Sequence, residues 1–228
     1  MKKVCSIVLL AFLYLPLFAS DNAGKADDRL KAAATVLDQI RNAPDQGIPE
    51  EVLGSAQCVA VVPSLLNGGF VVGARYGRGV ASCRTSKGWS APAFFVITGG
   101  SFGFQIGGQA VDLVMLVMND QGMQNLLSSK FKIGAGASAA AGPVGRHAAA
   151  DTDWKMKAQV LSYSRARGIF AGVDLNGAQI KQDKDTTREF YGHMVPFRTS
   201  LAGKVTAPSG AYPFLNELAG WAKVAADK

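Results

Sequence analysis

Glycine and proline interrupt a long apolar region between residues 57 and 118, and this pattern restricts the chain to a β-rich fold. Each apolar segment has the length of a strand and ends at a turn-forming residue. The predicted strands cover residues 57–62, 70–76, 79–84, 93–98 and 110–118. So many short strands with few helix caps favour a curved or closed antiparallel sheet, because closure removes exposed strand edges.

Helices are predicted on both sides of these strands in the sequence. Between Ala26 and Arg41 apolar residues recur at helical spacing, with charged residues between them. Asn119 can cap a short helix that runs to about Lys130. From Pro213 onward one helical stripe contains Phe214, Leu218, Trp221 and Ala225. The predicted fold class is α+β, mainly β: a glycine-rich, barrel-like antiparallel sheet with flanking N- and C-terminal helices.

The first twenty residues have the layout of a secretory signal. Lys2 and Lys3 precede an apolar run that ends in small residues. The run contains Pro16 and is shorter than the ~20 residues that a spanning helix needs, so cleavage near Ala19 is predicted. Cleavage lowers the formal net charge from +7 to +5. The expected organisation is a signal at 1–20, an amphipathic helix and linker at 21–47, and one domain at 48–228 that includes the C-terminal helix.

This signal predicts an exported protein, periplasmic or extracellular and peripheral to a membrane. Cys58 and Cys83 remain after cleavage, and an oxidising compartment permits a bridge worth roughly 3 to 4 kcal/mol. The alternative is two small buried apolar residues on neighbouring strands, which we favour because the sequence does not supply the Cα separation of a bridge. Neither a CxxC motif nor a Cys/His cluster occurs, so no metal site or cofactor is predicted.

Acidic residues are missing from two long stretches of the sequence. Residues 52–111 contain no Asp or Glu but four basic residues, and residues 121–150 contain three basic residues and no acid. This segregation predicts a positive field that favours anionic partners such as lipid headgroups. The alternative is a scatter of solvated loop charges. Nucleic acid is not an expected partner, because no nucleic-acid-binding signature occurs and the aromatic residues sit within apolar strands.

One string resembles a catalytic motif. Gly99 to Gly103 fits G-x-S-x-G with Ser101 as the nucleophile, but this turn needs a helix directly after it and residues 104–108 form helices poorly. His147 and His193 are available as bases without a local signature. We therefore interpret Ser101 as a turn residue and predict no enzymatic activity. Asp112, inside an apolar strand, is interpreted as a hydrogen-bonded structural group rather than a functional carboxylate.

Several ordered blocks between residues 48 and 195 carry a family resemblance. They are Gly69 to Val80, Trp89-Ser90-Ala91-Pro92, Gly103-Phe104-Gln105-Ile106-Gly107 with Asp112, Ala141 to Arg146, Tyr163 to Gly172, and Phe190-Tyr191-Gly192. In this order they resemble the SYLF domain of eukaryotic membrane-trafficking proteins and bacterial exported proteins. The resemblance implies no enzymatic activity.

The SYLF resemblance implies binding of anionic, phosphoinositide-type headgroups at a membrane surface, with an amphipathic N-terminal helix contributing. We expect the helix at Ala26 to Arg41 either to enter the membrane interface or to pack on the sheet. The candidate lipid-binding residues are Arg29, Lys31, Leu37, Arg75, Arg78, Arg84, Lys87, Lys155, Lys157, Arg165 and Arg167.

Two alternatives to lipid binding are an envelope structural module that binds another envelope protein, and a serine hydrolase that uses Ser101. A fungal branch of the SYLF family binds actin. The export signal, and the lack of an attached partner-binding module, argue against actin as a partner here.

Overall fold

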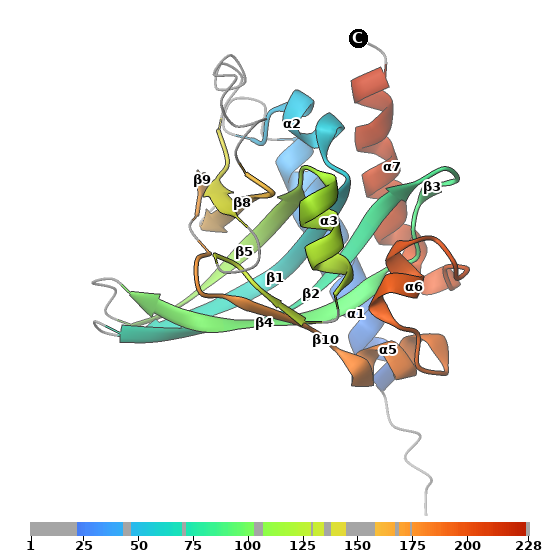
Figure 1. The fold of residues 1–228 in the computed structure, drawn as a ribbon, viewed down its shortest axis with the longest axis horizontal. Helices are drawn as coiled ribbons and strands as arrows, with labels where there is room; N and C mark the ends of the chain where they lie inside the picture. Colours follow the sequence, from blue (N-terminus) through green and yellow to red (C-terminus); the bar gives the residue numbers. More distant parts are fainter. Residues whose placement is uncertain are drawn as a thin grey trace, which may run out of the picture.

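A single curled β-sheet dominates the computed structural model (Figure 1). The structure describes residues 22–42, 47–69, 72–102, 107–128, 130–134, 138–144, 158–166, 169–173 and 175–226. The predicted signal segment lies outside these residues. The sheet forms a half-barrel in the strand order β6-β10-β4-β2-β1-β5-β8-β7, with β3 on β2 and β9 on β8.

The strand bounds confirm the predicted mainly β fold with a strongly curved sheet. They are β1 Cys58–Gly69, β2 Val72–Thr85, β3 Gly88–Trp89, β4 Ala93–Phe102, β5 Gly107–Val117, β6 Lys130–Lys132, β7 Ala139–Ala141, β8 Val160–Ala166, β9 Ile169–Gly172 and β10 Gln179–Gln182. The described part of the segment predicted at 70–76 forms one strand, β2, with the segment predicted at 79–84, because Gly77 and Gly79 continue the ladder to β4. One strand pair, β7 with β8, is parallel rather than antiparallel.

Helices lie on both sides of the sheet. The bounds are α1 Asn22–Arg41, α2 Glu50–Ser55, α3 Asp120–Leu127, α5 Lys184–Tyr191, α6 Phe197–Leu201, the 3-10 turn η2 Ser209–Ala211 and α7 Tyr212–Ala226. Figure 1 shows α1 and α7 on one side of the strands and α3 on the other. The Asn119 side chain accepts a hydrogen bond from the Gly122 amide, as the predicted cap requires. No helix among the described residues is both long and apolar enough to cross a membrane.

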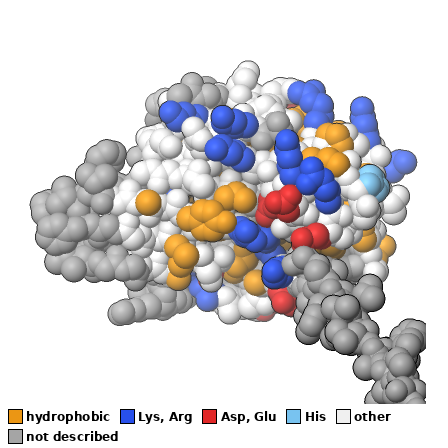
Figure 2. Space-filling view, turned by 90° about the horizontal axis from the view of Figure 1, so that it is seen from below, with side chains coloured by type: hydrophobic (Ala, Val, Ile, Leu, Met, Phe, Trp, Pro, Cys, Tyr) orange, Lys and Arg blue, Asp and Glu red, His pale blue; other side chains and the backbone are white. Residues whose placement is uncertain are grey.

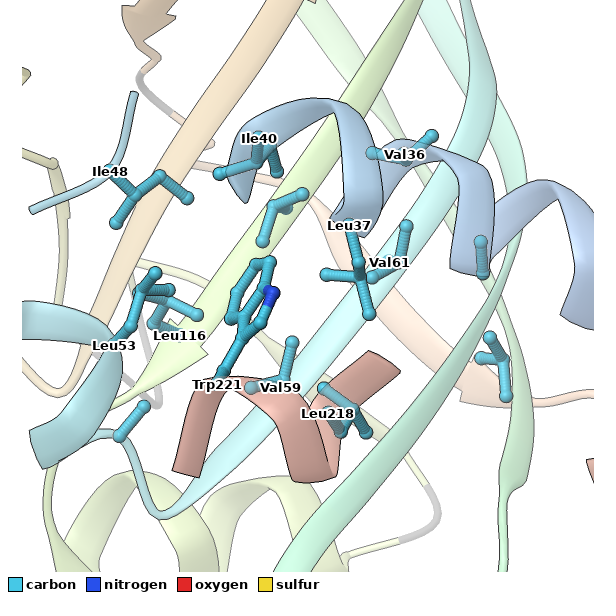
Figure 3. Packing of buried hydrophobic residues seen from close by; sticks show 14 of the residues in the cluster. Val36, Leu37, Ile40, Ile48, Leu53, Val59, Val61, Leu116, Leu218 and Trp221 are labelled. Atoms are coloured by element: carbon cyan, nitrogen blue, oxygen red, sulfur yellow. The ribbon is translucent and has the colours of Figure 1, made fainter. Parts of the chain in front are cut away.

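The outer face of the sheet is the face that α1, α2 and α7 cover. Its core joins Leu37 and Ile40 of α1 and Trp221 of α7 to Val59 and Leu116 of the strands (Figure 3). Leu30 and Leu37 are fully buried and Ile40 is 3% exposed. The apolar side of α1 therefore packs on the sheet, which confirms the second of the two expectations for this helix.

The inner face of the sheet carries a separate core. Val62 and Leu113 of the central strands meet Phe95, Ile97 and Ile180 from β4 and β10 there. Helices α3 and α6 add apolar residues to the same cluster. Because both faces of the central strands are buried, their residues show continuous rather than alternating hydrophobicity.

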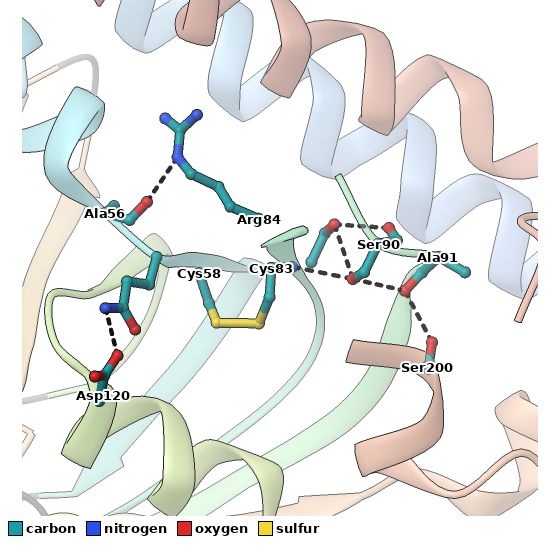
Figure 4. The surroundings of a disulfide bond; sticks show 10 residues. Ala56, Cys58, Cys83, Arg84, Ser90, Ala91, Asp120 and Ser200 are labelled. Atoms are coloured by element: carbon teal, nitrogen blue, oxygen red, sulfur yellow. Dashed lines mark hydrogen bonds between the residues drawn. A yellow bond between two sulfur atoms is a disulfide. The ribbon is translucent and has the colours of Figure 1, made fainter. Parts of the chain in front are cut away.

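Cys58 and Cys83 form a disulfide with an S–S distance of 2.03 Å, so our preference for two unbridged cysteines is wrong. Antiparallel pairing of β1 with β2 places the two residues directly opposite each other. Figure 4 shows the surrounding hydrogen bonds, in which the Arg84 Nε donates to the Ala56 carbonyl over 2.9 Å. Pairing register, which the sequence does not reveal, decides the bridge.

Strand β8 has buried residues on both of its faces. Residues 154–157 and Arg167 lie outside the described residues. In β8, Val160 and Leu161 point to opposite faces and are both buried, and Tyr163 is buried as well. Strand β8 has neighbours on both sides, β5 and β7, and both its faces join a core. Residues that point to either face of β8 are therefore buried.

Candidate functional site

Three of the predicted lipid-binding residues belong to the interior or to structural contacts. Leu37 of α1 is fully buried. Arg29 is 9% exposed, and its Nη1 lies 3.1 Å from the Asp183 carboxylate. Arg84 stacks on the Trp89 ring at 4.7 Å, and burial lowers its pKa. Leu37 and Arg29 are thus buried, and Arg84 is half-buried in this folded state.

The remaining predicted residues that the structure describes do not form one patch. Lys31 is exposed on α1, and Lys87 is exposed in the turn between β2 and β3. Arg75 and Arg78 point to opposite faces of β2, because they are an odd number of positions, three, apart along one strand. Arg165 of β8 lies 3.7 Å from the Asp112 carboxylate. Lys155 and Lys157 lie, with Arg167, outside the described residues.

Strand register instead gathers a different set of basic residues around Arg78. Val96 of β4 is the direct partner of both Arg78 in β2 and Lys181 in β10. Lys181 is in turn opposite Lys130 of the edge strand β6. Directly opposed residues point to the same face, so Arg78, Lys181 and Lys130 lie in one row across the outer face. All three are exposed.

The next row of the same face carries Lys132 and two exposed apolar side chains. Lys132 pairs with Gln179, whose other partner is Thr98 of β4. Thr98 is opposite Tyr76, and Tyr76 is opposite Leu66 of β1. Tyr76 is 44% exposed and Leu66 is 55% exposed.

These two rows define the candidate site. We call it the basic face: Arg78, Lys130, Lys132, Lys181, Tyr76 and Leu66. Figure 2 shows one face of the molecule, on which exposed apolar side chains lie near groups of Lys and Arg side chains, with Asp and Glu side chains beside them.

Like charges on the basic face lower the stability of the sheet. Lys130 and Lys181 occupy directly opposite positions, an arrangement in which like charges destabilise a sheet. Arg78 keeps its charge firmly, because a hydrogen bond from its Nε to the Tyr76 hydroxyl at 3.1 Å raises its pKa. Concentrated positive charge of this kind favours an anionic partner, whose binding would offset the repulsion.

A pocket of about 380 Å³ adjoins the basic face between α1 and the sheet. Its lining consists of Asp28, Arg29, Ala32, Pro63, Ser64, Leu66, Tyr76, Gly77 and Arg78. Leu66, Tyr76 and Arg78 are common to the pocket and the basic face. The volume lies at the lower end of the roughly 300–1,000 Å³ of small-molecule sites.

A β-bulge in β1 shapes one wall of this pocket. Between the pairs Val62–Leu113 and Leu65–Val111, the two residues Pro63 and Ser64 oppose the single residue Asp112. Ser64 has a φ of 58°, which is uncommon for a residue other than glycine. Its amide donates to the Asp112 carboxylate over 3.2 Å. Asp112 is therefore a hydrogen-bonded structural group, as predicted, and it holds the bulge.

A buried ion pair fixes α1 beside the pocket. Asp183 accepts hydrogen bonds from the Thr186 hydroxyl at 2.8 Å and from the Thr186 amide at 3.2 Å, in addition to its contact with Arg29. Burial alone would raise the pKa of Asp183, but these hydrogen bonds and the Arg29 charge together hold it below its ordinary value. The Arg29 guanidinium also lies 5.5 Å from the centre of the Phe94 ring. Helix α1 is thus joined to α5 as well as to the sheet.

The described residues nearest to Ser101 on either side belong to strands. Ser101 lies within strand β4, where it pairs with Gly73 of β2, so our interpretation of Ser101 as a turn residue is wrong; the next described element is strand β5. His193 is exposed beyond α5, and His147 lies outside the described residues. Among the described residues no group of three or more His, Cys, Asp or Glu side chains is placed to hold a metal.

Sequence reasoning missed Lys130, Lys132 and Lys181, as well as Tyr76 and Leu66, as members of a site. The acid-free stretch that contains Lys130 and Lys132 was the available signal. Lys181 gave none, because it lies in a region with many acids. Only the pairing of β10 with both β4 and β6 brings these residues together.

Comparison of the sequence with known proteins shows the family to which this chain belongs. The model of the Ysc84 family, described as a Las17-binding protein actin regulator, matches residues 98–220. SH3 domain-containing YSC84-like protein 1 of Bos taurus is 33% identical over 188 residues, which is 79% of this chain and 55% of that protein. The Homo sapiens protein of that name is 34% identical over 188 residues, with the same coverage of 79% and 55%.

A fungal relative matches in the same way. Protein YSC84 of Saccharomyces cerevisiae is 33% identical over 178 residues, which is 76% of this chain and 38% of that protein. This chain belongs to the Ysc84 family, whose domain is the SYLF domain, and the resemblance predicted from its motifs is confirmed. It spans about half the length, or less, of these relatives. The family description is that of a binding protein rather than an enzyme.

Proposed function

We propose that this protein binds the surface of anionic membranes through the basic face, without catalysing a reaction. The observation that carries the proposal is the row of Arg78, Lys181 and Lys130, with Lys132 beside it, on one exposed surface. Tyr76 and Leu66 lie on the same surface, and exposed aromatic and aliphatic side chains suit the boundary between headgroups and acyl chains. The predicted export signal, if cleaved, would place this face in an envelope compartment.

The expected affinity is modest and reversible. Each Lys or Arg near an anionic bilayer contributes about 1 kcal/mol, so the four charges of the basic face contribute about 4 kcal/mol. That energy alone corresponds to a dissociation constant of about 1 mM. Partial burial of Tyr76 and Leu66 in the interface would add to it at roughly 25 cal/mol per Å² of apolar area.

In this proposal helix α1 stays on the sheet during membrane binding. Removal of Leu30, Leu37 and Ile40 from the core would expose their side chains, at about 1.5–3 kcal/mol each. Insertion of these side chains into lipid would bury them again and offset that cost. Val59, Val61 and Leu116 on the sheet would then face water. The net cost is therefore of the order of several kcal/mol, and the ion pair of Arg29 with Asp183 adds to it.

The test is sedimentation of the purified protein with vesicles of phosphatidylcholine alone or with added phosphatidylglycerol or a phosphoinositide, at low and moderate salt. The variant Lys130→Glu/Lys181→Glu reverses two charges of the basic face. Its matched control, Lys87→Glu/Lys204→Glu, makes the same charge change at exposed positions outside that face.

We expect wild-type protein to sediment with anionic vesicles and to be released as salt rises, because salt screens exposed charges. Lys130→Glu/Lys181→Glu should weaken the binding at least tenfold, while the control variant binds within about twofold of wild type. Equal losses in both variants would show that net charge, and not the basic face, drives binding. No sedimentation with any anionic vesicle would refute the proposed function.

A second candidate is a protein partner, because relatives of this chain are named as Las17-binding and actin-regulating proteins. The exposed Tyr76 and Leu66 would then serve as contact residues. A Tyr76→Ala/Leu66→Ala variant separates the two candidates. For membrane docking this variant should retain most of the salt-sensitive vesicle binding, whereas an apolar protein interface would depend on these two residues and little on salt.

A further inference from the structure

The pocket beside the basic face combines an apolar lining with two charged groups at its surface. Ala32 of α1, Pro63 and Leu66 of β1, and the Tyr76 ring supply apolar surface. Asp28, Leu66, Tyr76 and Arg78 are exposed, whereas Arg29 is buried. The pocket therefore opens on the surface that we propose to meet the membrane, beside α1.

Arg78 is the cationic group that this pocket offers to a ligand. Its Nε is occupied by the Tyr76 hydroxyl, and among the described residues no acceptor is recorded for its two terminal amino groups. Such a pair of N–H donors matches two oxygens of a phosphate. The other cation in the lining, Arg29, already contacts Asp183 and Thr186.

Asp28 limits how much negative charge the pocket accepts. Its carboxylate is in the lining together with Arg78, so the two open charges are one positive and one negative. A phosphodiester with a single negative charge can use Arg78 while its headgroup lies away from Asp28. A headgroup with additional phosphates would bring further negative charge toward Asp28, and like charges at short range repel.

We propose that this pocket holds one phospholipid molecule whose headgroup carries a single negative charge, with the phosphate on Arg78 and the glycerol and first methylenes against Ala32, Pro63, Leu66 and Tyr76. The inference rests on the proposed function and deepens it. The basic face attracts the bilayer without regard to chemical detail, and the pocket selects one lipid.

The probe is dihexanoyl phosphatidylglycerol below its micelle-forming concentration, titrated into the protein by calorimetry. Glycerophosphoglycerol, which has the same headgroup without acyl chains, tests the apolar lining. A dihexanoyl phosphoinositide bisphosphate tests the charge limit. Ala32→Leu fills the pocket from α1, and Ala34→Leu makes the same change on the same helix at a half-buried position outside the lining.

We expect saturable binding of the short-chain phosphatidylglycerol, at least tenfold weaker binding of the chain-free headgroup, and at least tenfold weaker binding of the lipid by Ala32→Leu but not by Ala34→Leu. Asp28→Asn should raise the affinity for the bisphosphate relative to phosphatidylglycerol. Unfolding midpoints of the variants establish that they are folded.

The inference and the proposed function fail differently. The pocket assignment is wrong if wild-type protein sediments with anionic vesicles but does not bind the short-chain lipid. It is also wrong if Ala32→Leu binds the short-chain lipid as well as wild type does. Membrane docking stands in both cases. If neither vesicles nor short-chain lipid bind, both are wrong. Preference for the bisphosphate in wild-type protein would overturn the single-charge assignment.

Discussion

The ion pair between Arg29 and Asp183 gives the sharpest test of how α1 is held. Both side chains are less than one-tenth exposed, at 7% and 9%. We consider three variants: Arg29→Met, Asp183→Asn and the double variant. Methionine keeps the length and the apolar stem of Arg29. Asparagine keeps an oxygen that can accept a hydrogen bond from the Thr186 amide, whose nitrogen is 3.2 Å from the Asp183 carboxylate.

The expected loss in the free energy of unfolding depends on which buried charge each substitution leaves without its partner. Asp183→Asn leaves the buried Arg29 charge without a counter-ion, which costs about 3–5 kcal/mol. Arg29→Met leaves the Asp183 charge, but the Thr186 hydroxyl and amide still bind it, so we expect the lower end of that range, about 3 kcal/mol. The double variant removes both charges. Replacement of a buried pair by neutral groups is often close to neutral, so it should cost no more than about 2 kcal/mol.

Urea unfolding of the four proteins measures this cycle, with the stability change taken from the midpoint at constant slope. The expected coupling is at least about 4 kcal/mol, because the single costs sum to at least about 6 kcal/mol and the double variant costs no more than about 2 kcal/mol. A double variant whose cost equals the sum of the single costs within about 0.5 kcal/mol would refute the reasoning, because it would show independent sites.

Acid provides a second measurement of the same pair. The pKa of Asp183 is lower in the folded state than its ordinary value of about 3.9. Its contribution is therefore complete above that ordinary value and is lost as pH falls through the lower folded pKa. Stability of the wild-type protein should fall across this acid range more steeply than that of Asp183→Asn. Equal slopes in the two proteins would contradict the assigned direction of the shift.

Two further predictions concern the sheet. Cys58→Ser/Cys83→Ser removes a bridge with a sequence separation of 25 and should lower the free energy of unfolding by about 3.5 kcal/mol. Urea unfolding measures this change, and no loss of stability would contradict a stabilising bridge. Both cysteines are fully buried, so reductant should act only under unfolding conditions. Gly79→Ala places a Cβ 2.7 Å from the Val61 carbonyl oxygen and against the Phe95 ring, and should cost about 1–3 kcal/mol in thermal unfolding. Gly68→Ala, where a Cβ meets nothing within 4 Å, is the control, and similar losses in both would exclude overpacking as the cause.

The sequence was informative wherever a structural signal is local. The spacing of Leu30, Leu37 and Ile40 predicted a helix, and α1 has its apolar side in the core. The Asn119 cap and the C-terminal stripe of Phe214, Leu218 and Trp221 were predicted in the same way and are present in α3 and α7. Such signals depend on neighbours within one or two turns of the chain, so they survive without tertiary information.

The candidate site was less predictable, since its residues come from distant segments. Of the predicted lipid-binding residues, Arg78 lies in the basic face, whereas Arg29 and Leu37 are buried. An amphipathic helix offers the same pattern to a membrane and to a sheet, and only the apolar outer face with Val59 and Leu116 decides between them. Charge counts along the chain likewise did not indicate that Lys181, from an acidic region, lies opposite Lys130.

By itself the sequence determined that this chain folds as a glycine-rich sheet with flanking helices, and that it belongs with the SYLF domains, because strand length, turn residues and motif order are properties of contiguous residues. Tertiary structure decided which side chains meet. The register of β1 with β2 joins Cys58 to Cys83, and the pairing of β10 between β4 and β6 forms the basic row. Register is a non-local property, since a shift of one residue moves every side chain of a strand to the other face.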